Sequence, residues 1–186
     1  MAAARPIPDL TRTEDFLAWV WGQDHKFEMI EGRLVMMAGG SRHHSRIAVN
    51  ATAALNNRLA GGRCQTFNSD FLVETNGINR YYPDVTVACG EDRDFTDKPV
   101  LIIEVLSPST MREDLGPKRR NYMRIPSLEY LLYVWQDQVK AWLYLPAEGE
   151  DARPREYLSL DQVIDLPVLG LALPLAELYR DVADLT

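Results

Sequence analysis

Residues that build metal and disulfide sites are scarce in this chain. Its 186 residues include only 2 cysteines and 3 histidines, and none of them is spaced as zinc ligands usually are. Cys64 and Cys89 stand alone in the sequence, so we expect no disulfide framework. Neither zinc nor an organic cofactor is indicated by any motif.

Long apolar runs and an excess of positive charge are also missing. No apolar run approaches the ~20 residues of a membrane helix, and the N-terminus lacks the apolar core of a signal peptide. A cytoplasmic location without membrane contact is therefore the default expectation. The net charge of −7 argues against a protein that coats nucleic acid, so DNA binding would need a local basic patch. The length predicts one domain over residues 1–186, with residues 1–12 as an N-terminal arm.

Two short apolar runs each carry one acid where an apolar residue would be expected. Asp84 opens the run Val85–Val87, and Glu104 lies near the end of the run Val100–Leu106. Both runs are typical of buried strands, where an unpaired carboxylate is costly and two would repel each other. A hard divalent ion, Mg²⁺ or Mn²⁺, would remove both difficulties. A buried Glu–Arg pair is the alternative interpretation of Glu104.

A helix is predicted to follow the second run, from between Thr110 and Pro117 to about Ile125. Asp114, Lys118 and Tyr122 would share one of its faces at i, i+4 and i+8. They could form a surface ion pair of little value. Alternatively, Asp114 positions Lys118 toward Glu104. The helix is locally basic, and a solvated face or phosphate contacts would explain Arg119, Arg120 and Arg124.

These residues form a pattern that resembles a known family. Pro83-Asp84 followed by Glu104-Val105-Leu106 is similar to the Pro-Asp…(Asp/Glu)-x-Lys signature of restriction-endonuclease-like proteins. The finer pattern, which adds Ser107-Pro108-Ser109-Thr110, Asp114-x-x-x-Lys118-x-x-x-Tyr122 and Glu129-Tyr130, resembles the bacterial Uma-two family over nearly the whole chain. Leu106 stands where the general signature has lysine, and the resemblance implies that Lys118 supplies it.

The resemblance implies an α/β (α+β) fold, in which helices flank a mixed central sheet that carries an N-terminal helix and hairpin and a C-terminal extension. It also implies an endonuclease that hydrolyses DNA with Mg²⁺ or Mn²⁺ and acts as a homodimer. Asp84, Glu104 and the Val105 carbonyl would hold the ion, and Lys118 would orient the attacking water or stabilise the phosphate charge. Two alternatives stay open: a catalytically silent DNA- or protein-binding module, and a structural homodimer whose acids are only ion-paired.

Several other polar residues are candidates for supporting roles, each with a structural alternative. His44 opens the helix predicted over residues 43–59, where it could contact a phosphate or pair with a backbone group. Asp70 could be a further acid near the metal or a partner for an arginine. The same choice holds for Glu28 and Glu31, because a hairpin turning at Glu31-Gly32 would also expose them as strand and turn charges.

Overall fold

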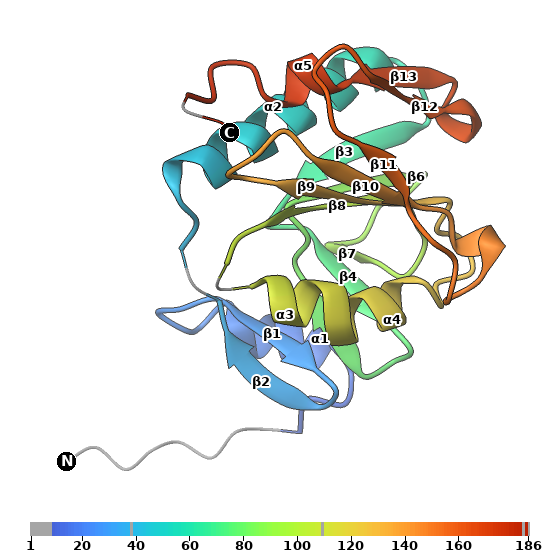
Figure 1. The fold of residues 1–186 in the computed structure, drawn as a ribbon. Coiled ribbons are helices and arrows are strands. Elements are labelled where there is room, and N and C mark those ends of the chain that lie inside the picture. Colours follow the sequence, from blue (N-terminus) through green and yellow to red (C-terminus); the bar gives the residue numbers. More distant parts are fainter. Residues whose placement is uncertain (1–8, 38, 109, 184, 186) are drawn as a thin grey trace.

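A six-stranded mixed sheet forms the centre of the computed structural model, which describes residues 9–37, 39–108, 110–183 and 185 (Figure 1). The strand order is β11-β10-β9-β8-β6-β3, with β8 parallel to β9 and antiparallel to β6. This mixed sheet with flanking helices confirms the predicted fold class. The strands are β3 (Cys64–Asn68), β6 (Val85–Cys89), β8 (Pro99–Leu106), β9 (Tyr130–Trp135), β10 (Ala141–Tyr144) and β11 (Arg155–Tyr157).

The central strand β8 is buried on both faces, and its side chains alternate between two cores. Leu101, Ile103 and Val105 pack toward the helix α2 (Arg42–Leu59). Ile102 and Leu106 belong to the opposite core. Because the strand period is two residues, Glu104 must face this opposite side as well.

The α2 face of the sheet also carries the C-terminal elements (Figure 1). The strands β12 (Val163–Leu166) and β13 (Leu171–Pro174) pair as a hairpin, which the helix α5 (Leu175–Leu178) follows. Gly170 has a positive φ of 65° and reverses the chain, so that the apolar residues after it can pair with β12.

The opposite face is covered by one irregular helix. It consists of α3 (Met111–Glu113), a π-helical turn (Asp114–Lys118) and α4 (Arg119–Tyr122). Gly116 departs from helical geometry (φ −101°, ψ −107°), and Pro117 after it has no backbone N–H to donate. The wide turn buries the side chains of Asp114 and Lys118 under the helix.

A second, five-stranded sheet packs below this helix (Figure 1). Its order is β2 (Arg33–Met36), β1 (Phe27–Ile30), β5 (Asn79–Tyr81), β4 (Leu72–Thr75) and β7 (Phe95–Thr96). The β1–β2 turn lies at Glu31-Gly32, as predicted, with positive φ angles of 49° and 75°. The sequence had placed this hairpin as an extension of a single central sheet, whereas it belongs to a sheet of its own.

The helix α1 (Thr13–Val20) closes the second sheet through Phe16, Leu17 and Val20. Leu10 of the predicted arm is buried in the same core, so the described part of the arm is docked, and residues 1–8 lie outside the described residues. Arg12 is the N-cap residue of α1. The hydroxyl of Thr13, the first helical residue, bonds to Glu74 and Arg80.

Cys64 and Cys89 form a disulfide between β3 and β6, so the expectation of no disulfide is wrong. The two residues are partners in the antiparallel register of these strands. They lie 25 residues apart in the sequence, and only the strand pairing brings them together.

Reduction of this disulfide is expected to lower the free energy of unfolding by about 3 kcal/mol, because the bond closes a long loop in the unfolded chain. Urea unfolding with and without reductant measures the difference. A thiol assay of the denatured, unreduced protein provides the control. Two reactive thiols before reduction would show that the bond had not formed.

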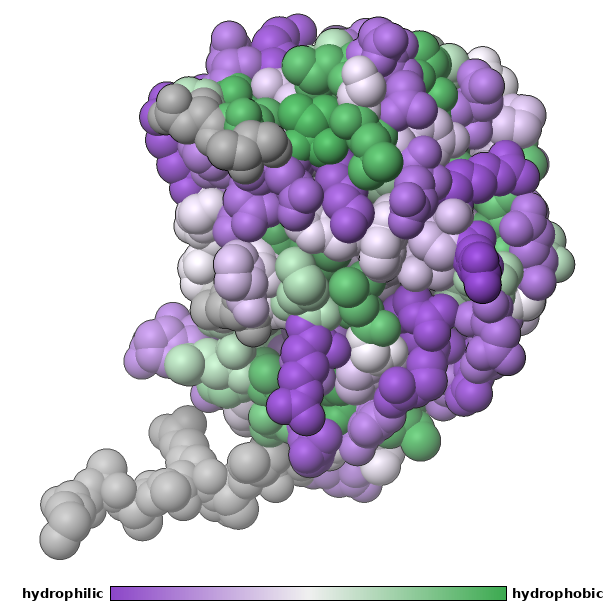
Figure 2. Space-filling view, viewed as in Figure 1, coloured by the Kyte–Doolittle hydropathy of each residue, from purple (hydrophilic) through white to green (hydrophobic). Residues whose placement is uncertain are grey.

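Hydrophilic residues cover most of the face shown in Figure 2, and the largest apolar area lies near α5 and the C-terminal end. No helix in the described part of the chain is long and apolar enough to cross a membrane.

Candidate active site

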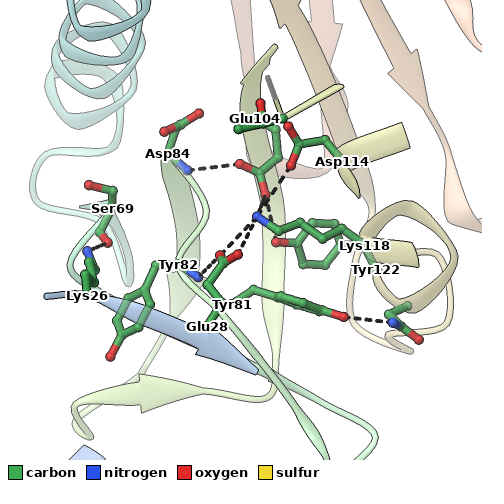
Figure 3. Close-up of polar contacts among 12 residues, drawn as sticks. Lys26, Glu28, Ser69, Tyr81, Tyr82, Asp84, Glu104, Asp114, Lys118 and Tyr122 are labelled. Carbon is green, nitrogen blue, oxygen red and sulfur yellow. Dashed lines mark hydrogen bonds and ion pairs between the residues drawn. The ribbon is translucent and has the colours of Figure 1, made fainter. Parts of the chain in front are cut away.

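Three carboxylates meet one ammonium group between the two sheets, and Asp84 lies beside them (Figure 3). The Lys118 Nζ lies 2.9 Å from Glu28 Oε2, 3.4 Å from Asp114 Oδ1 and 3.5 Å from Glu104 Oε1. Asp84 directly precedes β6 and adjoins Glu104, whose Oε2 lies 3.4 Å from the Asp84 backbone N. Glu28, Glu104, Asp114 and Lys118 are all buried. The single positive charge of Lys118 is therefore outnumbered by the buried carboxylates around it.

The Glu104 carboxylate is fixed from two sides. The Tyr122 hydroxyl donates to Oε1 over 2.8 Å, and the Asp84 backbone N–H faces Oε2. Burial raises the pKa of Glu104 well above its usual range. Lys118 opposes this rise, but the neighbouring carboxylates of Asp114, Asp84 and Glu28 add to it. Ionisation of Glu104 therefore costs more free energy in the folded protein than in the unfolded chain.

The pKa values of Lys118 and Asp114 are both shifted by burial and by neighbouring charges of the cluster. Burial lowers the pKa of Lys118, but Glu104, Glu28 and Asp114 together raise it well above its usual range. Burial raises the pKa of Asp114, and Lys118 only partly offsets the rise. The lysine is consequently charged at neutral pH, and its three acidic neighbours depend on that charge.

Asp84 is held by a separate set of contacts. The Val105 backbone N–H donates to Oδ2 over 2.7 Å, and His44 Nε2 lies 3.2 Å from the same oxygen. Burial lowers the pKa of His44, but hydrogen bonding to Asp84 and to the Val105 carbonyl raises it above its ordinary value overall. The imidazole thus contacts Asp84, one of the groups that the sequence predicts as metal ligands.

The His44 ring is packed against Gly40. A β-carbon at residue 40 would lie 2.8 Å from His44 Nδ1 and 3.1 Å from Cγ, which is too close for either atom. Gly39 has nothing within 4 Å of the corresponding position. Glycine is therefore needed at residue 40, but not at residue 39, to leave room for the imidazole beside Asp84.

We expect Gly40→Ala to displace the imidazole and to lower the pKa of His44, because the contact with Asp84 that raises it is lost. Gly39→Ala is the matched control and should leave the pKa of His44 unchanged. NMR titration of the imidazole resonances measures both. Identical titration of the two alanine variants would contradict the proposed packing.

The predicted supporting residues divide into two groups. Asp114, Tyr122 and His44 join the cluster through the contacts described above. Glu31 and Asp70 do not. Glu31 is largely exposed and lies 3.5 Å from Arg120, while Asp70 is exposed and lies 2.8 Å from Lys26.

The three arginines predicted to contact phosphate have partners within the protein. Arg124 Nε lies 2.5 Å from the Glu150 carboxylate, and Arg119 donates over 2.8 Å to the Glu150 carbonyl. Arg120 is the partner of Glu31. A phosphate would have to compete with these contacts.

Glu28 is the important site residue that sequence reasoning undervalued. It is 4% exposed, accepts a hydrogen bond from the Tyr82 backbone N–H over 2.9 Å, and pairs with Lys118. The available signal was the one that identified Glu104, namely an acid among the apolar residues of a strand. Here the exposed hairpin turn at Glu31-Gly32 suggested a solvated strand instead.

The donor set of the cluster fits a hard divalent ion in kind, since it offers carboxylate oxygens with unbalanced negative charge. It is not preassembled: among the described residues, no three His, Cys, Asp or Glu side chains form a group that could hold an ion. In Figure 3 the carboxylates of Asp84 and Glu104 point in different directions. An ion would need a side-chain rotation, or further oxygens from water or substrate.

The fold and this cluster together define a restriction-endonuclease-like protein. Residues 13–176 match the Uma2 family, which is described as "Putative restriction endonuclease". The chain belongs to this family, as its sequence motifs had indicated.

Three individual proteins are similar to this chain in sequence or in fold. The uncharacterized protein slr1290 of Synechocystis is 36% identical over 184 residues, which cover 96% of this chain and 95% of that protein. A second Synechocystis protein, sll1609, is 36% identical over 116 residues, covering 58% of this chain and 65% of that protein. The crystal structure of a "putative nuclease belonging to DUF820" from Anabaena variabilis has the same fold, with a TM-score of 0.74, 17% identity, and coverage of 89% of this chain and 96% of that one.

Proposed function

We propose that this protein is a divalent-metal-dependent endonuclease that hydrolyses phosphodiester bonds in DNA. The observation that carries the proposal is the burial of Glu104 next to Asp84 and Lys118. Buried carboxylates in excess of their cationic partners are costly, and they cluster at functional sites. The family and its solved nuclease-like relative support the same class of reaction.

Asp84, Glu104 and the Val105 carbonyl would hold Mg²⁺ or Mn²⁺, which lowers the pKa of a water molecule and polarises a phosphate when bound. Lys118 would donate hydrogen bonds to that water or to a phosphate oxygen. Glu28 and Asp114 hold its ammonium group in place. Tyr122 orients Glu104, and His44 orients Asp84, so each acid has its own positioning residue.

Pairing of two chains into a homodimer and the arrangement of residues 1–186 as one domain belong to the same proposal. The homodimer follows the restriction-type precedent, and the single domain follows from the chain length. Analytical ultracentrifugation of the purified protein, with and without DNA, tests the first. Limited proteolysis tests the second.

Hydrolysis of a supercoiled plasmid in Mn²⁺ or Mg²⁺ tests the proposed activity. Asp84→Asn should reduce the rate on the order of a hundredfold or more, because a ligand of the ion that would stabilise charge in the transition state is lost. Asp165→Asn removes an exposed carboxylate from β12 and should cut at the native rate. Equal rates for the two variants would refute the assignment of Asp84. Metal-independent binding without any cutting would favour the binding module.

A further inference from the structure

A groove with a volume of about 800 Å³ opens beside the candidate active site. One face of α2 forms a wall, and Asn68, Ser69 and Lys26 lie among the other lining residues. The groove and the acidic pocket share five residues as a common border: Met37, Gly39, Gly40, His44 and Asp84. A polymeric substrate that reacts at Asp84 could therefore extend along α2.

The lining of this groove carries little negative charge, although the protein as a whole has a net charge of −7. Among the described residues that line it, Asp84 at its inner end is the only acid. The wall of α2 presents hydroxyl and amide groups, from Thr52 and Asn56 among others, and the exposed apolar side chain of Val49. Such groups hydrogen-bond phosphate and sugar oxygens without the repulsion that carboxylates would cause.

The basic helix on the opposite face of the sheet is a poorer candidate for the same role. Arg119 and Arg124 contact Glu150, and Arg120 contacts Glu31, so these arginines are already occupied. In the groove along α2, the Thr52 hydroxyl donates to the Ala48 carbonyl over 2.8 Å, but the exposed amide of Asn56 is available on the wall.

We propose that one polynucleotide strand lies in this groove, with its reacting phosphate at Asp84 and its neighbouring nucleotides along α2. The inference rests on the proposed nuclease function and adds the path of the substrate. Hydroxyl and amide contacts to phosphate and sugar hold a strand without reading its bases. The groove therefore binds nucleic acid with little dependence on sequence.

Two consecutive asparagines offer a matched test. Both are exposed residues of α2, but Asn56 lines the groove whereas Asn57 does not. Asn56→Asp and Asn57→Asp add the same charge to the same helix, so long-range repulsion of nucleic acid is matched. Only Asn56→Asp places the charge beside the proposed strand.

The two variants are made in a Glu104→Gln background, so that nothing is cut, and anisotropy measures the binding of a labelled oligodeoxynucleotide, single-stranded and as a duplex. Asn56→Asp should weaken binding by about fivefold, and Asn57→Asp by less than roughly twofold, since only residue 56 adjoins the strand and the shared long-range repulsion is screened by salt. Asn56→Lys should tighten binding more than Asn57→Lys does. Melting temperatures verify that all variants are folded.

Equal effects at the two positions, or no binding of either probe, would contradict the proposal that a strand lies in this groove. Failure of the nuclease function would look different. In that case Asn56→Asp would still weaken binding selectively, while the native protein would not cut DNA in Mn²⁺. Conversely, cutting by the native protein with equal effects at Asn56 and Asn57 would refute only the strand path.

Discussion

Glu104→Gln is expected to raise the melting temperature of the metal-free protein at neutral pH. Burial and the neighbouring acids raise the pKa of Glu104 in the folded state, so ionisation of this carboxyl opposes folding. Glutamine removes the charge and can still accept the hydrogen bond of Tyr122. Lys118 keeps Glu28 at 2.9 Å and Asp114 at 3.4 Å. The gain equals the free energy of the raised pKa, and each unit of that rise corresponds to about 1.4 kcal/mol.

The stability gained by Glu104→Gln should depend on pH. The cost of ionised Glu104 is absent at pH values below its pKa in the unfolded chain, grows above that pKa, and is complete above the higher folded-state pKa. The gain from glutamine should therefore vanish on acidification. Glu156→Gln, on an exposed position of β11, is the control and should change little at any pH. A loss of stability in Glu104→Gln at neutral pH would mean that Lys118 stabilises the ionised carboxylate.

Lys118→Met is expected to have the opposite and larger effect. It removes the ammonium group that Glu28, Glu104 and Asp114 share, and it leaves these buried carboxylates to repel one another. Loss of one partner from a buried ion pair costs about 3–5 kcal/mol. In a chain of this length each kcal/mol corresponds to roughly 2–4 °C in melting temperature. Calorimetry or thermal unfolding followed by circular dichroism measures the shift.

A matched lysine separates this effect from the loss of any surface charge. Lys140 lies 4.5 Å from the centre of the Trp135 ring and outside the acidic cluster, so Lys140→Met should cost far less. Mn²⁺ should restore more stability to Lys118→Met than to Lys140→Met, because the ion can replace the missing positive charge. Equal losses in the two variants would show that the acids do not depend on Lys118.

The acids of the central strands could be predicted because each interrupts an apolar run. The same rule applies to Glu28, yet its strand β1 is followed by an exposed turn and by β2, which is mostly exposed. The burial of Glu28 comes from Lys118 and the Tyr82 backbone, which lie 90 and 54 residues away in the chain. A local pattern does not contain such contacts.

Other differences have the same physical origin. Apolar runs predicted the two central strands beside Asp84 and Glu104, but they did not indicate that the N-terminal hairpin pairs with β5 in a second sheet. The bond between Cys64 and Cys89 depends on the register of β3 against β6. Lys118 was predicted from its helical spacing and the family pattern, but the wide turn at Gly116-Pro117 that buries it was not foreseen.

The claim that this acidic cluster binds a divalent ion is tested most directly by thermal unfolding during a Mn²⁺ titration. The native protein and Asp165→Asn should gain melting temperature until the site saturates, whereas Asp84→Asn and Glu104→Gln should not. The titration is repeated with an oligodeoxynucleotide, because substrate oxygens can complete the ligand set. No shift of the native protein under either condition, or an equal shift in all four proteins, would contradict metal binding at Asp84 and Glu104.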